Sequence, residues 1–289
     1  MAVLGFLLVD KPKDVTSFFV VTTLRKILGI RRIGFAGTLD PLATGLMIVA
    51  VGEATKLLNA LEQMDKVYDV TVRFGAVSDT CDAEGPLHDY PNPAHPTRAR
   101  IESAVEEHFS GERQQIPPRY SAVKIKGQRA YALARKGQHV ELPSKKVFFH
   151  DVKIKSFSWP DLHATLHCGS GTYIRSFAHD LGQLLKCGGY VQELRRTKIA
   201  SFPVKNAVPL AEITALNCRK ILLKPEEFLK DWQQCLLDED EYRQLCHGAF
   251  IANKGGLRPG PILGIYKGET VGLLETVNKD QLKFAKKFN

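Results

Sequence analysis

Apolar residues in the first quarter of the chain recur with two different periods. An unbroken apolar run covers residues 3–9, which suits a buried strand and is too short to span a bilayer. After a polar turn, apolar residues recur at helical spacing between Ser17, an expected N-cap, and Gly29, an expected helix stop. Residues 68–74 then alternate between apolar and polar, which predicts a half-buried strand.

The middle of the chain continues this mixture of strands and single helices. Thr97 is placed to cap a helix that ends near Gly111, and residues 152–157 and 162–168 have the alternation of strands. A further helix follows residues 172–175. Strands interrupted by single helices predict an α+β fold rather than a regular βαβ repeat.

The texture of the sequence changes near its end. Short apolar strands at residues 262–266 and 270–274 stand between turns rich in glycine and proline. We therefore expect a large domain over residues 1–232, which would be the catalytic domain of an enzyme, and a small β-rich domain over residues 233–289.

Positive charge concentrates in one segment. The sequence has 40 Lys+Arg against 31 Asp+Glu, and its net charge of +9 favours a polyanionic partner. Residues 113–146 hold nine basic residues against Glu141 alone, which gives +8 of that charge. Charge runs are usually solvated loops, but this segment also carries Tyr120 and Tyr131, a mixture that suits binding RNA phosphates and stacking bases.

Cysteine and histidine spacing indicates no metal site. The six cysteines include no CxxC pair, which argues against a zinc ribbon or a disulfide framework and fits a reducing cytoplasm. His163 and His167 would lie roughly 13 Å apart along a strand, too far for one zinc ion. Asp79, Asp82 and Glu84 do not have the spacing of a calcium-binding loop.

The most informative stretch is residues 34–45, in which Asp40 is the only acid among glycines, threonines and apolar residues. Asp40 followed by Pro41 is a natural start for a helix, and helix capping is the simpler interpretation of the pair. Capping leaves the surrounding glycines unexplained, whereas glycines that admit a ligand would account for them.

This stretch resembles the pattern around the catalytic aspartate of the TruB family of tRNA pseudouridine synthases. The resemblance extends over residues 5–202 and implies a mixed, largely antiparallel central sheet flanked by helices, with an active-site cleft and a small C-terminal PUA-like domain. The motifs that carry it are Asp10-Lys-Pro, Lys66-x-Tyr68, residues 78–85, residues 116–124, Gly171-Thr-Tyr-Ile-Arg175 and Leu194-Arg-Arg-Thr197.

The resemblance also implies roles for single residues. Asp40 would be the catalytic carboxylate, Tyr68 the ring that stacks on the target uracil, and Arg175 the cation paired with Asp40. Isomerising uridine to pseudouridine involves no net redox change, so the resemblance implies no cofactor and no metal. The residues expected to bind substrate are Lys11, Phe35, Asp82, Tyr173, Leu194, Lys124, Lys126 and Arg129.

The basic segment 113–146 corresponds by resemblance to a thumb loop that closes over the T-arm of tRNA. The expected enzyme is a cytoplasmic monomer that contacts no membrane and needs no protein partner. Two positions depart from the family pattern. Phe35 stands where relatives commonly have histidine, and Asp14 stands where they have glycine, which raises the question of the backbone angle there.

Three functions follow as hypotheses. The first is a stand-alone synthase that modifies the T-loop uridine at position 55 of tRNA. The second is a guide-RNA-dependent synthase with the same catalytic core, and the third is a non-catalytic protein that binds or folds RNA. The basic segment favours the first over the second, and the Asp40 motif favours both enzymes over the third.

Overall fold

A mixed ten-stranded sheet forms the centre of the protein. The computed structural model describes residues 4–121, 123–125, 128–130 and 142–288. The strands of the sheet are β1 (Gly5–Lys11), β2 (Ile33–Ala36), β3 (Thr44–Val51), β4 (Lys66–Phe74), β7 (Gly111–Gln115), β10 (Lys145–Ser158), β11 (Asp161–Cys168), β12 (Gly189–Ile199), β13 (Phe202–Pro203) and β14 (Val208–Pro209).

The strand order is β14-β1-β3-β12-β4-β11-β10-β7, with β2 beside β3 and β13 beside β12. The pairs β1–β14 and β3–β12 are parallel, and the other pairs of this sheet are antiparallel. The expected mixed, largely antiparallel sheet is therefore confirmed. Only two residue pairs join β12 to β3, so the sheet is weakly joined at its middle.

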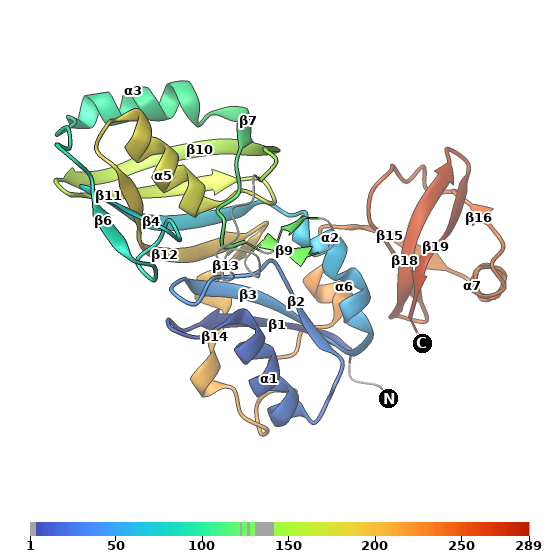
Figure 1. Ribbon diagram of the computed structural model, residues 1–289. Coiled ribbons are helices and arrows are strands. Elements are labelled where there is room, and N and C mark those ends of the chain that lie inside the picture. The colour runs from blue at the N-terminus through green and yellow to red at the C-terminus, as the bar shows by residue number, and fades with distance from the viewer. Residues whose placement is uncertain (1–3, 122, 126–127, 131–141, 289) are drawn as a thin grey trace.

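Helices lie against this sheet and cover its hydrophobic core, except for the helix Glu239–Cys246, which lies beside the second sheet (Figure 1). None of the described helices is long and apolar enough to cross a membrane. The helices and 3-10 turns are α1 (Ser17–Leu28), η1 (Gly52–Leu57), α2 (Leu58–Glu62), α3 (Arg98–His108), α5 (Ile174–Leu184), η2 (Val204–Asn206), η3 (Leu210–Glu212), α6 (Pro225–Phe228) and α7 (Glu239–Cys246).

Helix α1 begins one residue earlier than the sequence suggested. Thr16, not Ser17, is the N-cap, and its side chain accepts a hydrogen bond from the Phe19 amide. The Ser17 hydroxyl instead exchanges hydrogen bonds with both backbone groups of Leu39, each 2.9 Å long. The residue expected to cap the helix therefore ties it to the loop that carries Asp40. Gly29 ends the helix as expected, with a left-handed φ of 68°.

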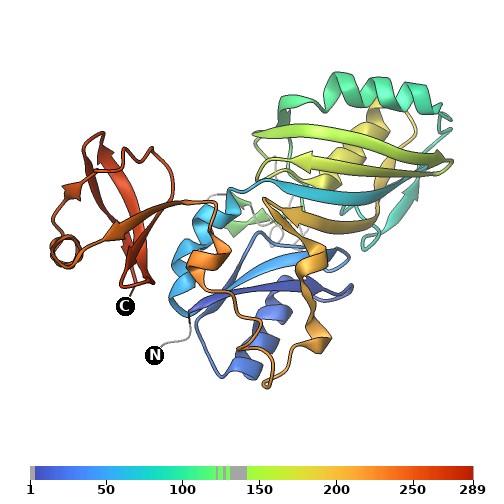
Figure 2. The same cartoon turned by 180° about the vertical axis from the view of Figure 1, so that it is seen from behind.

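One face of the β4–β11–β10 region is covered by helices α3 and α5, and the other is open. Val70 and Val72 of β4 point into the core with Phe177 and Leu181 of α5. Asp69, on the alternate face, is exposed. Seen from behind, the strands have no helix in front of them (Figure 2). The alternation expected for residues 68–74 thus separates a buried face from a polar one.

A second sheet follows the first in sequence. It has the order β15-β17-β18-β19-β16 and packs through Leu263 and Phe288 against η1 of the main sheet region. Its strands are β15 (Gln233–Leu237), β16 (Ile251–Ala252), β17 (Ile262–Tyr266), β18 (Glu269–Asn278) and β19 (Gln281–Lys287). Two small hairpins complete the described structure: β5 (Ala76–Ser78) with β6 (Leu87–Asp89), and β8 (Lys124–Ile125) with β9 (Gln128–Arg129).

Candidate active site

Asp40 lies in the loop between β2 and β3 and caps no helix. The Ala43 amide donates to the Asp40 carbonyl over 3.1 Å, and the chain then enters β3. The helix-capping interpretation is therefore wrong. Gly45 explains one of the surrounding glycines: its φ is 105°, and a Cβ there would lie 2.3 Å from the Arg196 carbonyl oxygen. That glycine admits the neighbouring strand β12 rather than a ligand.

The Asp40 carboxylate is held by the Arg175 guanidinium through two contacts. Arg175 Nε lies 2.9 Å from Asp40 Oδ2, and Nη2 lies 3.2 Å from Oδ1. The Arg175 side chain is 8% exposed and that of Asp40 is 35% exposed. The carboxylate is therefore fixed in orientation by a bidentate pair and remains open to a ligand.

Further contacts fix the guanidinium itself. Arg175 donates to the carbonyl oxygens of Thr80, over 3.1 Å, and Tyr120, over 3.0 Å. It also lies 3.3 Å from Asp82 Oδ2, whose side chain is almost completely buried. With Asp40, these partners come from three separate segments of the chain. The arginine is consequently a rigid part of the structure, which is what a charge-stabilising group needs.

The start of α5 places Arg175. Gln115, at the end of β7, accepts a hydrogen bond from the Tyr173 amide over 2.8 Å and donates one to the Tyr173 carbonyl over 3.0 Å. This double contact fixes the residue that precedes α5. Lys145 Nζ lies 4.4 Å from the centre of the Tyr173 ring, a cation–π contact at the mouth of the site.

Two opposing effects set the ionisation of Asp40. Loss of hydration in the crevice raises the pKa of its carboxyl group, and the Arg175 charge works against that rise. The Asp82 carboxylate raises the Asp40 pKa further, while Lys11 lowers it. Because desolvation is the largest effect, the pKa of Asp40 lies above its ordinary value, and Arg175 limits the increase.

Tyr68 and Leu194 lie on adjacent strands of the buried face. Tyr68 is on β4, Leu194 is on β12, and both belong to the main core. Arg196 is the Cα partner of Tyr68 and hydrogen-bonds to it. Burial raises the pKa of the Tyr68 hydroxyl, which therefore stays neutral. The Asp40 charge also raises the pKa of the Tyr68 hydroxyl, as a smaller effect than burial.

Lys11, which was expected to bind substrate, is buried against the loop that carries Asp40. Its side chain is fully buried, and its ammonium group donates to the carbonyls of Pro12, Val15 and Pro41. Burial lowers its pKa to about 8. All three donors are occupied within the protein, so the side chain holds the Asp40 loop in place, and its expected contact with substrate stays a prediction.

The remaining expected substrate contacts are more scattered. Phe35 is half-buried on β2 and packs against the main core. Lys124 and Arg129 are Cα partners across the β8–β9 hairpin, while Lys126 lies outside the described residues. Asp14 has a φ of 64°, so the position where relatives have glycine does use the left-handed conformation.

Arg196 is a site residue that the sequence did not single out. Its side chain is 1% exposed and donates from Nε to the Leu46 carbonyl over 2.7 Å and from Nη2 to the Gly37 carbonyl over 3.1 Å. It therefore joins β12 to both sides of the Asp40 loop. A signal existed: alternation along β12 places Arg196 on the same face as Leu194.

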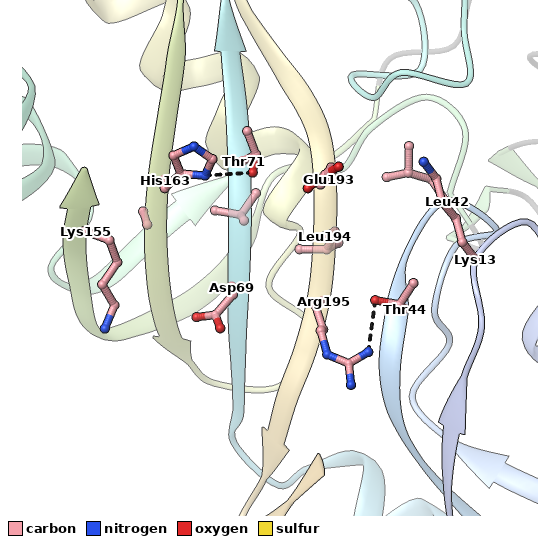
Figure 3. A pocket seen from close by; sticks show the side chains of 12 residues that line it. Lys13, Leu42, Thr44, Asp69, Thr71, Lys155, His163, Glu193, Leu194 and Arg195 are labelled. Carbon is pink, nitrogen blue, oxygen red and sulfur yellow. Dashed lines mark hydrogen bonds between the residues drawn. The ribbon is translucent and has the colours of Figure 1, made fainter. Parts of the chain in front are cut away.

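A pocket of roughly 500 Å³ lies across β10, β11, β4, β12 and β3, and neither Asp40 nor Arg175 lines it. Figure 3 shows Asp69, Thr71 and His163 in it, with His163 bonded to Thr71 over 3.0 Å. Arg195 donates a hydrogen bond to the Thr44 hydroxyl and forms an ion pair with Asp10 over 2.6 Å. Most of the charged and polar side chains that line this pocket, such as Asp69 and Glu193, belong to the open face of the sheet, and Leu194 also contributes to its lining.

Solved structures show where this fold has been seen. The protein in the crystal structure of a Cbf5-Nop10-Gar1 complex matches with a TM-score of 0.75 at 21% identity, covering 98% of this chain and 84% of the other. One in an H/ACA RNP bound to a substrate RNA matches with a TM-score of 0.74 at 20% identity, covering 99% and 85%. The chain therefore has the pseudouridine synthase fold.

Sequence comparison gives the family. The model of the TruB family pseudouridylate synthase N-terminal domain matches residues 25–174, and that of the tRNA pseudouridylate synthase B C-terminal domain matches residues 175–233. The chain belongs to the TruB family. Proteins called tRNA pseudouridine synthase B are similar to it: that of Thermobifida fusca is 39% identical, with 89% of each chain covered, and that of Clostridium tetani is 33% identical, with 98% of each covered.

Proposed function

We propose that this protein isomerises the T-loop uridine at position 55 of tRNA to pseudouridine, with Asp40 as the catalytic carboxylate. The observation that carries the proposal is the Asp40–Arg175 pair: a carboxylate whose pKa is raised by desolvation, fixed by two contacts of 2.9 and 3.2 Å, and still 35% exposed. The similarity to proteins called tRNA pseudouridine synthase B supports tRNA as the substrate.

The reaction breaks the bond between N1 and C1′, turns the uracil, and joins C5 to C1′. N1 takes up a proton and C5 loses one, so the atoms of the nucleotide are conserved. A carboxylate can promote this by attacking C1′ or by removing the proton at C2′, and both routes require its ionised form. Arg175 supports both by opposing the pKa increase that burial causes.

The uridine must leave the RNA stack before Asp40 can reach its sugar, which costs a few kcal/mol. Stacking on an aromatic side chain returns roughly 1–3 kcal/mol per base. We assign that role to Tyr68, whose hydroxyl is kept neutral by burial and whose pKa responds to the Asp40 charge. In this proposal Leu194 and Tyr173 form the walls around the flipped uracil, and Phe35 contacts the RNA from β2.

The rest of the chain supplies RNA affinity in this proposal. Residues 113–146 act as a thumb over the T-arm, using Lys124, Lys126 and Arg129 against phosphates. Residues 1–232 form the catalytic domain and residues 233–289 a PUA-like domain that contacts RNA. The enzyme works as a cytoplasmic monomer without a guide RNA, as its basic segment suggests.

The test is to incubate purified protein with unmodified tRNA transcript and map pseudouridine at nucleotide resolution. Wild-type protein should modify position 55 without additions. Asp40→Asn should bind tRNA with nearly unchanged affinity and lose product by at least about 10³-fold. Wild-type turnover by Asp40→Asn would reject the mechanism.

The same assay separates the other functions. Product that forms only after a guide RNA and partner proteins are added would support the guide-dependent function. Binding without product at any uridine, for wild-type protein, would support a non-catalytic RNA-binding function.

A further inference from the structure

Three side chains that could hold a metal ion meet on the open face of the sheet. The ligand atoms of Asp65, His150 and His167 all lie within 4.8 Å of one another. Asp65 Oδ2 is 3.1 Å from His150 Nε2, and the two imidazole rings stack with their centres 4.4 Å apart. The cluster is separate from the Asp40 crevice.

The sequence excluded His163 and His167 as a pair, and the structure shows where the missing partner of His167 comes from. His163 bonds to Thr71 instead. The β10–β11 register shifts between Phe149 and Asp151, so His150 is the extra residue of a bulge. A bulge redirects a side chain, and this one brings His150 over its neighbouring strand.

The third ligand comes from the residue before β4. His167 pairs with Val67 across the β11–β4 ladder, which places Asp65 near the same edge. Three neighbouring strand segments therefore contribute one ligand each: the bulge of β10, the last residues of β11 and the residue before β4. Such residues are far apart in sequence, and only strand pairing unites them.

The ligand chemistry suits a borderline divalent transition metal. Imidazole nitrogen with one carboxylate is a common donor set for zinc, whereas magnesium and calcium prefer oxygen ligands. Two ligands of one tetrahedral zinc ion lie about 3.4 Å apart, given Zn–N and Zn–O distances near 2.1 Å. The 3.1 Å between Asp65 Oδ2 and His150 Nε2 is close to that value. The other distances between ligand atoms are at most 4.8 Å, and rotation of the exposed His150 side chain shortens those that involve it.

We propose that Asp65, His150 and His167 bind one Zn²⁺ ion, with solvent in the remaining coordination position. The ion ties the start of β4, three residues before Tyr68, to β10 and β11. Metal binding to the folded state raises its stability by mass action. The site is thus a structural clamp on the strands beside the active-site cleft.

The experiment titrates metal-free full-length protein with Zn²⁺, following binding by calorimetry and unfolding by thermal melting, with Mg²⁺ as the comparison ion. Wild-type protein should bind one Zn²⁺ per chain and melt at a higher temperature with it, and Mg²⁺ should have no such effect. His150→Ala and His167→Ala should each weaken zinc binding at least tenfold.

The matched control is His163→Ala, which removes a histidine from the outward face of the same strand. It should bind Zn²⁺ as the wild type does. Asp65→Asn keeps the shape of the carboxylate and removes its charge, so it should also bind less tightly. Undiminished zinc binding in both His150→Ala and His167→Ala, or no stoichiometric binding by the wild type, would overturn the proposal.

Discussion

Two arginine–aspartate pairs in this protein have the same contact geometry and opposite electrostatic results. Arg175 contacts Asp40 in the crevice, where the arginine side chain is 8% exposed. Arg73 contacts Asp161 on the open face, where Nε and Nη2 each lie 2.8 Å from a carboxylate oxygen and the arginine is 40% exposed. The pKa of Asp40 is raised, whereas that of Asp161 is lowered by the Arg73 hydrogen bonds.

The difference shows that burial, not pairing, decides the sign. On the open face water still solvates Asp161, so the contact with Arg73 is the larger effect. In the crevice the loss of hydration exceeds what the guanidinium returns. The Asp40–Arg175 pair thus holds a carboxylate with a raised pKa, and the surface pair is a modest stabilising contact.

The largest expected effect comes from Arg175→Met, which should lower the free energy of unfolding by about 3–5 kcal/mol because it leaves Asp40 and the buried Asp82 unpaired. The pKa of Asp40 should rise further, so the acid limb of the pH–rate profile should move to higher pH. Chemical denaturation and single-turnover assays across pH measure both.

Arg175→Lys and Arg73→Met are the controls for that experiment. Lysine keeps the positive charge but cannot contact both carboxylate oxygens as the planar guanidinium does. It should therefore shift the acid limb less than methionine does. Arg73→Met should leave the pH–rate profile unchanged. An unmoved acid limb in both Arg175 variants would contradict the role given to this guanidinium.

The next effect is on stability alone. Arg196→Met should lower the free energy of unfolding by about 3 kcal/mol, because it leaves the carbonyls of Leu46 and Gly37 without their donors. Arg195→Met, on the partly exposed alternate face, should cost less than about 1 kcal/mol. Urea melts of the two variants test this, and equal losses would contradict the difference in burial.

A smaller effect distinguishes function from stability at position 40. The raised pKa means that Asp40 favours folding below its unfolded pKa and loses that contribution as pH rises through the folded value. At neutral pH, Asp40→Asn should therefore be as stable as the wild type or more so, by no more than about 1 kcal/mol after screening by solvent. A clearly less stable variant would show that the pair stabilises the fold.

The smallest expected effect is that of Asp161→Asn, below about 1 kcal/mol. The pKa of Asp161 is lowered, so its contribution is present above the unfolded pKa and is lost as pH falls through the folded value. The variant should have a lower free energy of unfolding than the wild type at neutral pH and an equal one at acidic pH, and chemical denaturation at both pH values measures this. A deficit that persists in acid would point to packing instead of charge.

The sequence determined much of the local structure. The alternation of residues 68–74 gave β4, Thr97 does cap α3, and Gly29 does end α1. Local patterns succeed because backbone geometry and side-chain burial repeat with short periods. Motif similarity identified the family and pointed to Asp40 and Arg175, which the structure places in contact.

Tertiary structure alone decided what each site residue touches. The sequence did not decide whether Asp40 caps a helix, did not show that Lys11 is buried, and gave Arg196 no role. Resolving these required knowing which strands are neighbours: β12 beside β3 buries Arg196 under the Asp40 loop, and the β10 bulge brings His150 to His167. Contacts between residues more than a hundred positions apart depend on strand order and register, which no short-range pattern encodes.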